Sequence, residues 1–196
     1  MDRVKPPDIR LVEKLGRFDK PYWSVADLQK ILGYKSRRTL LVTLHRLAAQ
    51  GVLKRIRRGI YRVSMRSADT AVLANLLYRP SYLSFESVLA RYGILSQIPY
   101  TVTLATTRRS KKTTLEGTAV EYRQLRPDLF FGYRIEKGLE IAEPEKALLD
   151  ALYLVKRGRL SLPLEELNLS VLSSGKLKSY KARFPGYVQD ALAALQ

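Results

Sequence analysis

Serine and glycine residues divide the first third of the chain into short elements whose order restricts the fold. Ser24 suits a helix N-cap, and Asp27, three residues on, completes the spacing of a capping box. The helix that follows is expected to end at Gly33, a natural C′ residue. After a short connection, Ser36 is placed to cap another helix that runs to about Gln50. Two helices joined this closely are typical of a helix-turn-helix unit.

The flanking segments complete a winged pattern. Apolar residues recur at helical spacing from Asp8 to Phe18, and Pro6 and Pro7 are expected to keep that helix from starting earlier. Residues 52–63 place apolar and basic side chains around a turn at 57–59, which predicts a basic hairpin. Helix, helix, turn, helix and hairpin is the order of a winged helix-turn-helix domain, which we expect over residues 1–66.

The positive charge is concentrated in this same third of the chain. The whole sequence has 35 Lys and Arg against 18 Asp and Glu, a net charge of +17 and a pI near 10.2. Residues 1–63 hold 16 of the basic residues and 5 of the acidic ones. Such a field attracts polyanions and favours phosphate contacts, although charge alone would attract an anionic membrane equally. The partner surface is therefore expected in the first third.

Several functional classes are excluded by composition. The chain has no Cys, and its one His is His45, which rules out disulfides, Cys-ligated metal centres and multi-His metal sites. No signal peptide is recognisable, and no apolar run approaches the roughly 20 residues of a membrane span. No Walker-type glycine loop or GxSxG motif is present. We expect a cytoplasmic protein that is not an enzyme and that uses no cofactor and no metal.

The third helix and the hairpin are the predicted DNA-binding elements. Arginines in the first turn of a recognition helix can pair with guanine edges, and free N–H groups there suit a phosphate. Basic residues at a wing suit an adjacent groove or the backbone. The predicted contact residues are Lys35, Ser36, Arg37, Arg38, Thr39, Thr43, Arg46, Arg55, Arg57 and Arg58. One alternative stays open: three-helix units with a hairpin also serve as protein-interaction modules, whose charge only maintains solubility.

The remaining two thirds, residues 67–196, predict a mixed α+β domain that ends in helices, after a polar boundary at 64–69. Ser84 is expected to cap a short helix that closes at Gly93. The other predicted elements are a helix at 71–77, strands at 100–106, 118–125, 129–135 and 139–142, and a helix from Glu143 with Pro144 in its first turn. Beyond Pro163 the chain is expected to be helical, with turns at Gly175 and 185–186.

Two features of this second domain leave alternatives open. The polar stretch 107–114 contains four basic residues and either touches the DNA backbone or is a solvated turn. Glu143, Glu145 and Asp150 could serve as metal ligands of a nucleic-acid-processing enzyme, or the two glutamates could simply complement the helix dipole. We favour the dipole, because the acid and lysine spacing of one common nuclease motif is absent.

The sequence resembles the AbiEi family of antitoxins, the regulators of AbiE-type toxin–antitoxin pairs. The resemblance lies in residues 47–55 (LAAQGVLKR) and 58–61 (RGIY), and in residues 82–94 and 141–150 (IAEPEKALLD). It implies an N-terminal winged helix that binds inverted repeats of double-stranded DNA in its own promoter and represses transcription. It also implies a C-terminal domain that counteracts a nucleotidyltransferase-like toxin partner without a stable complex. A solitary regulator with no toxin partner remains an alternative.

Overall fold

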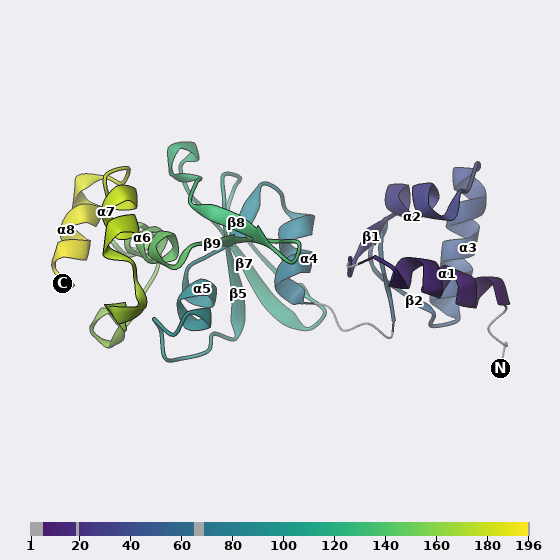
Figure 1. Ribbon diagram of the computed structural model, residues 1–196, viewed down its shortest axis with the longest axis horizontal. Helices are drawn as coiled ribbons and strands as arrows, with labels where there is room; N and C mark the ends of the chain where they lie inside the picture. Colours follow the sequence, from purple (N-terminus) through teal and green to yellow (C-terminus); the bar gives the residue numbers. More distant parts are fainter. Residues whose placement is uncertain (1–5, 19, 65–68, 196) are drawn as a thin grey trace. The chain divides into compact units, whose positions relative to one another are not determined.

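The chain folds as two compact units, Met1–Asp69 and Thr70–Gln196, each with a hydrophobic core of its own. The computed structural model describes residues 6–18, 20–64 and 69–195, with side chains from residue 11 onward (Figure 1). The fold is mixed α+β, as predicted: helices and a small sheet come first, then a larger sheet and a set of terminal helices. The polar boundary expected at 64–69 includes residues 65–68, which lie outside the described residues.

The N-terminal unit has the element order of a winged helix. Its elements are α1 (Pro6–Gly16), β1 (Trp23–Ser24), α2 (Val25–Leu32), α3 (Arg37–Ala49), β2 (Leu53–Arg57) and β3 (Ile60–Val63). The expected bounds of α1 were wrong, because the helix includes Pro6 and Pro7 and ends before Phe18. Proline is tolerated in a first turn since the N–H groups there have no partner within the helix.

Side-chain caps set the limits of α2 and α3. Ser24 Oγ accepts the backbone N–H of Asp27 at 3.1 Å, and the Asp27 carboxylate accepts the N–H of Ser24 at 2.9 Å. This reciprocal pair is the predicted capping box. Gly33, at φ 71°, ends α2 in the left-handed conformation, and Ser36 Oγ accepts the N–H of Thr39 at 3.3 Å to begin α3. The local signals that predicted the helix-turn-helix are confirmed.

A three-stranded sheet in the order β1-β3-β2 completes the unit. The predicted hairpin is confirmed as β2 and β3, with a bulge between Arg55 and Arg57. The short strand β1 was not predicted. Leu28, Leu40, Leu44 and Leu47 are fully buried in the core beneath the helices.

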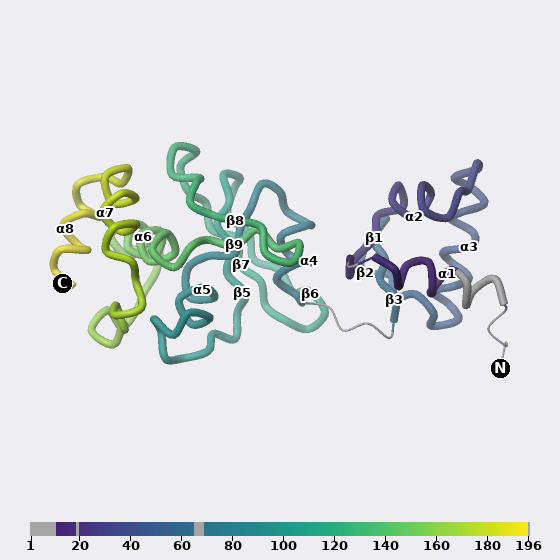
Figure 2. The backbone as a smooth tube through the Cα atoms, in the orientation of Figure 1, coloured from purple at the N-terminus to yellow at the C-terminus, as the bar shows by residue number. Residues whose placement is uncertain are grey.

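The C-terminal unit is built on a six-stranded mixed sheet in the order β6-β7-β5-β4-β9-β8. Its elements are α4 (Thr70–Leu77), β4 (Ser81–Leu83), α5 (Glu86–Arg91), β5 (Thr101–Thr106), β6 (Lys111–Leu115), β7 (Thr118–Gln124), β8 (Tyr133–Glu136), β9 (Leu139–Ala142), α6 (Pro144–Val155), α7 (Ser174–Lys181) and α8 (Gly186–Ala193), with short 3-10 turns at 127–129, 164–166 and 169–171. Within this unit α6 lies between the sheet and the terminal helices α7 and α8 (Figures 1 and 2).

The strand register decides which helix covers which face of this sheet. Residues opposite one another on neighbouring strands share a face, so Tyr82 and Arg123, which both flank Ala105, lie on the same side. Tyr82 bonds to α6 and Arg123 to Glu86 of α5, so these two helices cover that face. On the other face Tyr122 donates to the carbonyl of Ala74 in α4 at 2.7 Å.

Several expectations for this unit were wrong. Ser84 does not cap α5: the residue at the N-cap is Phe85, at φ 55°, and the Ser84 hydroxyl instead donates to Asp150. The strand expected at 129–135 begins only at Tyr133, after a 3-10 turn. Gly175 lies inside α7, and Gly186 is the first residue of α8, so the break between these helices spans 182–185 and not 185–186. Strand β4 was not predicted at all.

Among the residues that the structure describes, no helix combines the length and hydropathy needed to cross a bilayer.

Candidate nucleic-acid interface

Helix α3 has one buried face and a basic, exposed beginning. Leu40 and Leu44 point into the core and are fully buried. Arg37, Arg38 and Thr39, in the first turn, are all exposed. Lys35 and Ser36, just before the helix, are exposed as well. The Ser36 cap uses only the oxygen of the hydroxyl, so its hydrogen can be donated to a phosphate. Five predicted contact residues therefore lie together at one end of α3.

The two predicted contacts farther along α3 are less accessible. Thr43 is half-buried; its hydroxyl donates to the carbonyl of Thr39 at 3.0 Å and accepts from the Tyr34 hydroxyl at 3.4 Å. Arg46 is half-buried too, and its guanidinium donates to the Gln50 side chain at 3.3 Å. Val42, which was not among the predicted contacts, is 66% exposed in the middle of the outer face. An apolar side chain there can contact a thymine methyl group.

The hairpin separates its basic residues into different positions. Arg57 and Arg58 lie at the turn and are exposed, and Gly59 adopts φ 82°, which that turn requires. Arg57 lies opposite Ile60 beside the turn, whereas Arg55 lies opposite Tyr61, one pair farther from the turn and beyond the bulge. The structure therefore brings two of the three predicted hairpin arginines together. Sequence reasoning missed the second basic pair, in which Lys54 stands directly opposite Arg62 across the strands.

Helix α2 connects the two basic regions. The backbone N–H of Val25, at its start, donates to the carbonyl of Gly59 at 3.0 Å and fixes the hairpin turn there. Its other end leads through Gly33 directly to α3. Because α2 has eight residues, its ends are separated by roughly 12 Å. That is about the width of the major groove of B-DNA.

The electrostatics of this unit favour an anion. From residue 28 to residue 63 the sequence has ten Lys and Arg and no Asp or Glu. The nearest preceding acid, Asp27, is engaged in its capping box and in an ion pair with Lys20 at 2.9 Å. Burial raises the pKa of Asp27, but hydrogen bonds from Lys20 and Ser24 outweigh burial and hold that pKa below its usual value. Asp27 therefore stays charged and paired with Lys20.

The three carboxylates considered as metal ligands do not converge. Glu143 accepts from Lys176 at 2.9 Å and from the Tyr180 hydroxyl at 2.5 Å. Glu145 accepts the backbone N–H of Ser173 at 2.8 Å. Within the described part of the chain, no group of three His, Cys, Asp or Glu side chains is arranged to hold a metal. Both glutamates fasten the segment containing α7 to the start of α6.

The third carboxylate, Asp150, is fully buried in a polar cluster. It forms an ion pair with Lys146, also fully buried, one turn earlier on α6. Its second oxygen accepts the hydroxyls of Tyr82 and Ser84, each at 2.9 Å, and the Lys146 ammonium donates to the Tyr82 hydroxyl at 2.8 Å. Burial raises the pKa of Tyr82 well above its usual value, and the Asp150 charge adds to the rise. The cluster ties β4 to α6 in the core.

The basic stretch after β5 is more structured than a solvated turn. Residues 111–115 form strand β6, and Lys112 forms an ion pair with Glu121 of β7 at 3.3 Å. The Arg108 guanidinium lies 4.3 Å from the centre of the Tyr78 ring. These contacts give Lys112 and Arg108 partners within the C-terminal unit.

The comparisons with known proteins bear on the N-terminal unit first. A family model described as a transcriptional regulator, AbiEi antitoxin, matches residues 22–64, which contain α2, α3 and the hairpin. Residues 22–64 match the AbiEi antitoxin family. The predicted resemblance is thus confirmed for this AbiEi-like segment, and the match covers every predicted contact residue. The part of the resemblance in residues 82–150 stays a prediction.

A solved structure resembles the whole chain. The crystal structure of the RV2827C protein from Mycobacterium tuberculosis has a TM-score of 0.61 and 16% sequence identity, and the match covers 99% of this chain and 78% of that chain. At this identity the likeness concerns the fold alone. No curated protein matches the chain.

Proposed function

We propose that the protein is a sequence-specific DNA-binding transcriptional regulator that represses its own promoter. The observation that carries the proposal is the exposed first turn of α3, where Arg37 and Arg38 stand in a segment without acidic residues. The match of residues 22–64 to a family of antitoxin transcriptional regulators supports it. The protein acts by occupying DNA, and no catalytic step is assigned to it.

The protein makes two kinds of contact with the duplex, one for sequence preference and one for affinity. Arg37, Arg38 and Thr39 enter the major groove, where the guanidinium groups pair with guanine and give sequence preference. Arg57 and Arg58 hold the hairpin turn on the phosphate backbone or an adjacent groove and give affinity. Lys35 and the Ser36 hydroxyl contact a phosphate at the start of α3. Thr43 and Arg46 extend the recognition surface along the helix. Arg55 adds positive charge beside the hairpin.

We further propose that this regulator is the antitoxin of an AbiE-type operon, with the C-terminal unit acting against a toxin without forming a stable complex with it. This part rests on the AbiEi-like segment and on the predicted resemblance of the C-terminal unit. Co-expression with the product of the neighbouring gene provides a direct check: the full chain restores growth, and a chain with the C-terminal unit removed does not.

Footprinting on the DNA upstream of the protein's own gene tests the regulatory proposal. Across a salt series, the protein is expected to protect a discrete inverted repeat. It is expected to bind random duplexes at least about 1,000-fold more weakly, which is the lower end of the ratio between specific and non-specific affinity for such regulators. Affinity falls steeply with salt because several phosphates are neutralised. Equal binding to upstream and random DNA overturns the proposal.

A further inference from the structure

A small, strongly basic pocket opens at one end of the C-terminal sheet. Its volume is about 190 Å³, and it lies between Arg126, just after β7, and Tyr153, Arg157 and Arg159 at the end of α6. Strand β7 runs parallel to β5, so the pocket lies beyond the carboxyl end of a parallel pair. Sheets with parallel strands commonly bind ligands at this edge.

A tight backbone turn brings two of the arginines to the pocket. Arg157 and Arg159 flank Gly158, which adopts φ 65°, and this left-handed turn is closed by hydrogen bonds to the last carbonyls of α6. The Arg157 guanidinium also donates to the Tyr153 hydroxyl at 2.6 Å. Tyr153 is only 2% exposed and is one of the residues that line the pocket, so it gives Arg157 a buried partner there. The Arg157 guanidinium therefore has a fixed partner in Tyr153 before any ligand arrives, and Arg159 extends from the same turn.

The charge of the pocket is not balanced by its own lining. Three guanidinium groups line it, and no Asp or Glu is among the lining residues. Asp128 lies next to the pocket and is committed to Arg126 through two contacts of 2.5 and 3.0 Å. Like charges held close together repel one another, and a bound anion relieves that repulsion. With one of three positive charges compensated, the pocket suits an anion of charge −2.

We propose that this pocket binds the phosphate group of a small phosphomonoester. A phosphomonoester is close to dianionic at neutral pH, and guanidinium groups bind phosphate oxygens through paired hydrogen bonds. The volume is below the 300 Å³ or more of pockets that enclose whole drug-sized ligands, so only the phosphate enters. The rest of the ligand lies outside, where the 41% exposed ring of Tyr187, stacked on Tyr153, offers an aromatic surface.

Calorimetric titration of the full chain at constant ionic strength tests the proposal, with AMP, cyclic AMP, adenosine and inorganic phosphate as probes. AMP and cyclic AMP share base and ribose but differ in phosphate charge, so AMP is expected to bind at least tenfold more tightly. Adenosine is expected not to bind. If inorganic phosphate binds as tightly as AMP, the physiological source is free phosphate, and if it binds more weakly, the source is a phosphorylated small molecule. Either result supports a phosphate site.

Matched variants locate the binding. Arg157→Gln with Arg159→Gln is expected to weaken AMP binding at least tenfold, and Arg157→Lys with Arg159→Lys to restore part of it. Arg91→Gln removes one charge from a surface ion pair of the same unit and is expected to change the affinity less than twofold. Circular dichroism confirms that each variant is folded. The proposal is overturned if AMP and cyclic AMP bind equally, or if Arg91→Gln loses as much affinity as the double variant. It is also overturned if random duplex DNA displaces AMP, because the pocket would then be a DNA contact.

Discussion

At the residue scale, Lys146 and Asp150 form a fully buried ion pair in the C-terminal unit. Removing one partner of a buried ion pair leaves the other charge without compensation in the core. We therefore expect Lys146→Met to lower the free energy of unfolding of this unit by about 3–5 kcal/mol. The control is Lys176→Met, which breaks the half-exposed ion pair with Glu143 and should cost much less. Urea unfolding of both variants measures the difference, and equal losses would contradict the account.

The contact between Glu143 and Tyr180 predicts how stability depends on pH. Burial raises the pKa of Glu143, but hydrogen bonds from Tyr180 and Lys176 outweigh it and leave the pKa below its ordinary 4.5. A carboxyl group whose pKa is lower in the folded chain stabilises the fold at pH values above its pKa in the unfolded chain. This contribution is lost as the pH falls through the pKa of the folded chain. The hydrogen bond to Glu143 raises the pKa of Tyr180 to about 12. Its contribution is complete below the ordinary value of 10.0 and is lost as the pH rises toward about 12.

Tyr180→Phe tests both limbs of this pH dependence. The substitution removes the phenol that titrates at about 12 and lets the pKa of Glu143 rise. Absorbance titration of the phenols and urea unfolding from pH 3 to 11 are the measurements. Tyr100→Phe, at a side chain that is 99% exposed, is the control and should leave the acid limb unchanged. If as many tyrosines titrate near pH 12 in Tyr180→Phe as in the unaltered protein, the assignment is wrong.

At the scale of single elements, the caps of α2 carry a measurable part of the stability of the N-terminal unit. Ser24→Ala removes the acceptor for the Asp27 N–H and should cost about 1 kcal/mol. Thermal unfolding measures this loss, and Ala26, exposed in the first turn of α2, offers a control as Ala26→Ser. A loss in Ser24→Ala no larger than in the control would show that the cap contributes nothing.

The elements also show where sequence reasoning succeeds. Helices α2 and α3 were predictable because their signals are local: Ser24, Gly33 and Ser36 act within a few residues. Strands β1 and β4 have two and three residues, and pairing with distant strands rather than propensity defines them. Ser84 has the right residue type for a cap, but a buried carboxylate 66 residues away takes its hydroxyl.

The same distinction applies to the candidate interface. The exposed arginines at the start of α3 follow directly from helical periodicity. The separation of Arg55 from the turn depends on a bulge, and the half-burial of Thr43 depends on Tyr34 packing beside it. Neither leaves a signal in the sequence. The arginine pocket joins residues from two distant segments, so only the folded chain reveals it.

At the scale of the whole molecule, two separate cores predict two separate unfolding events. The N-terminal core and the C-terminal core share no residues. Calorimetry of the full chain should therefore resolve two transitions, with Ser24→Ala lowering only the midpoint of one and Lys146→Met only that of the other. A single transition shifted by both substitutions would contradict this description of two units.

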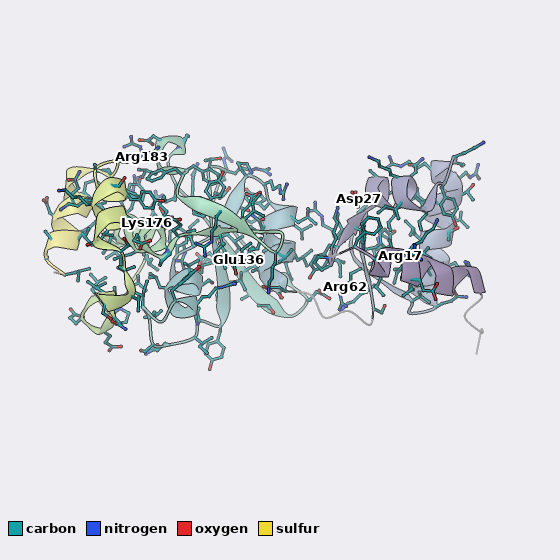
Figure 3. All side chains as sticks on the ribbon, in the orientation of Figure 1. Arg17, Asp27, Arg62, Glu136, Lys176 and Arg183 are labelled. Atoms are coloured by element: carbon teal, nitrogen blue, oxygen red, sulfur yellow. The ribbon has the colours of Figure 1, made fainter. Side chains whose placement is uncertain are left out.

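The specificity ratio of two arginine variants tests the central claim most directly. Binding to the protected promoter site and to a scrambled duplex is measured by fluorescence anisotropy across a salt series, with Arg17→Ala, located after α1, as control (Figure 3). Arg38→Ala should cost about 1–3 kcal/mol on the promoter site and little on the scrambled one, so the ratio falls. Arg57→Ala should weaken both equally and reduce the salt slope by about 1. An unchanged ratio in Arg38→Ala would contradict the assignment of α3 as the helix that recognises the sequence.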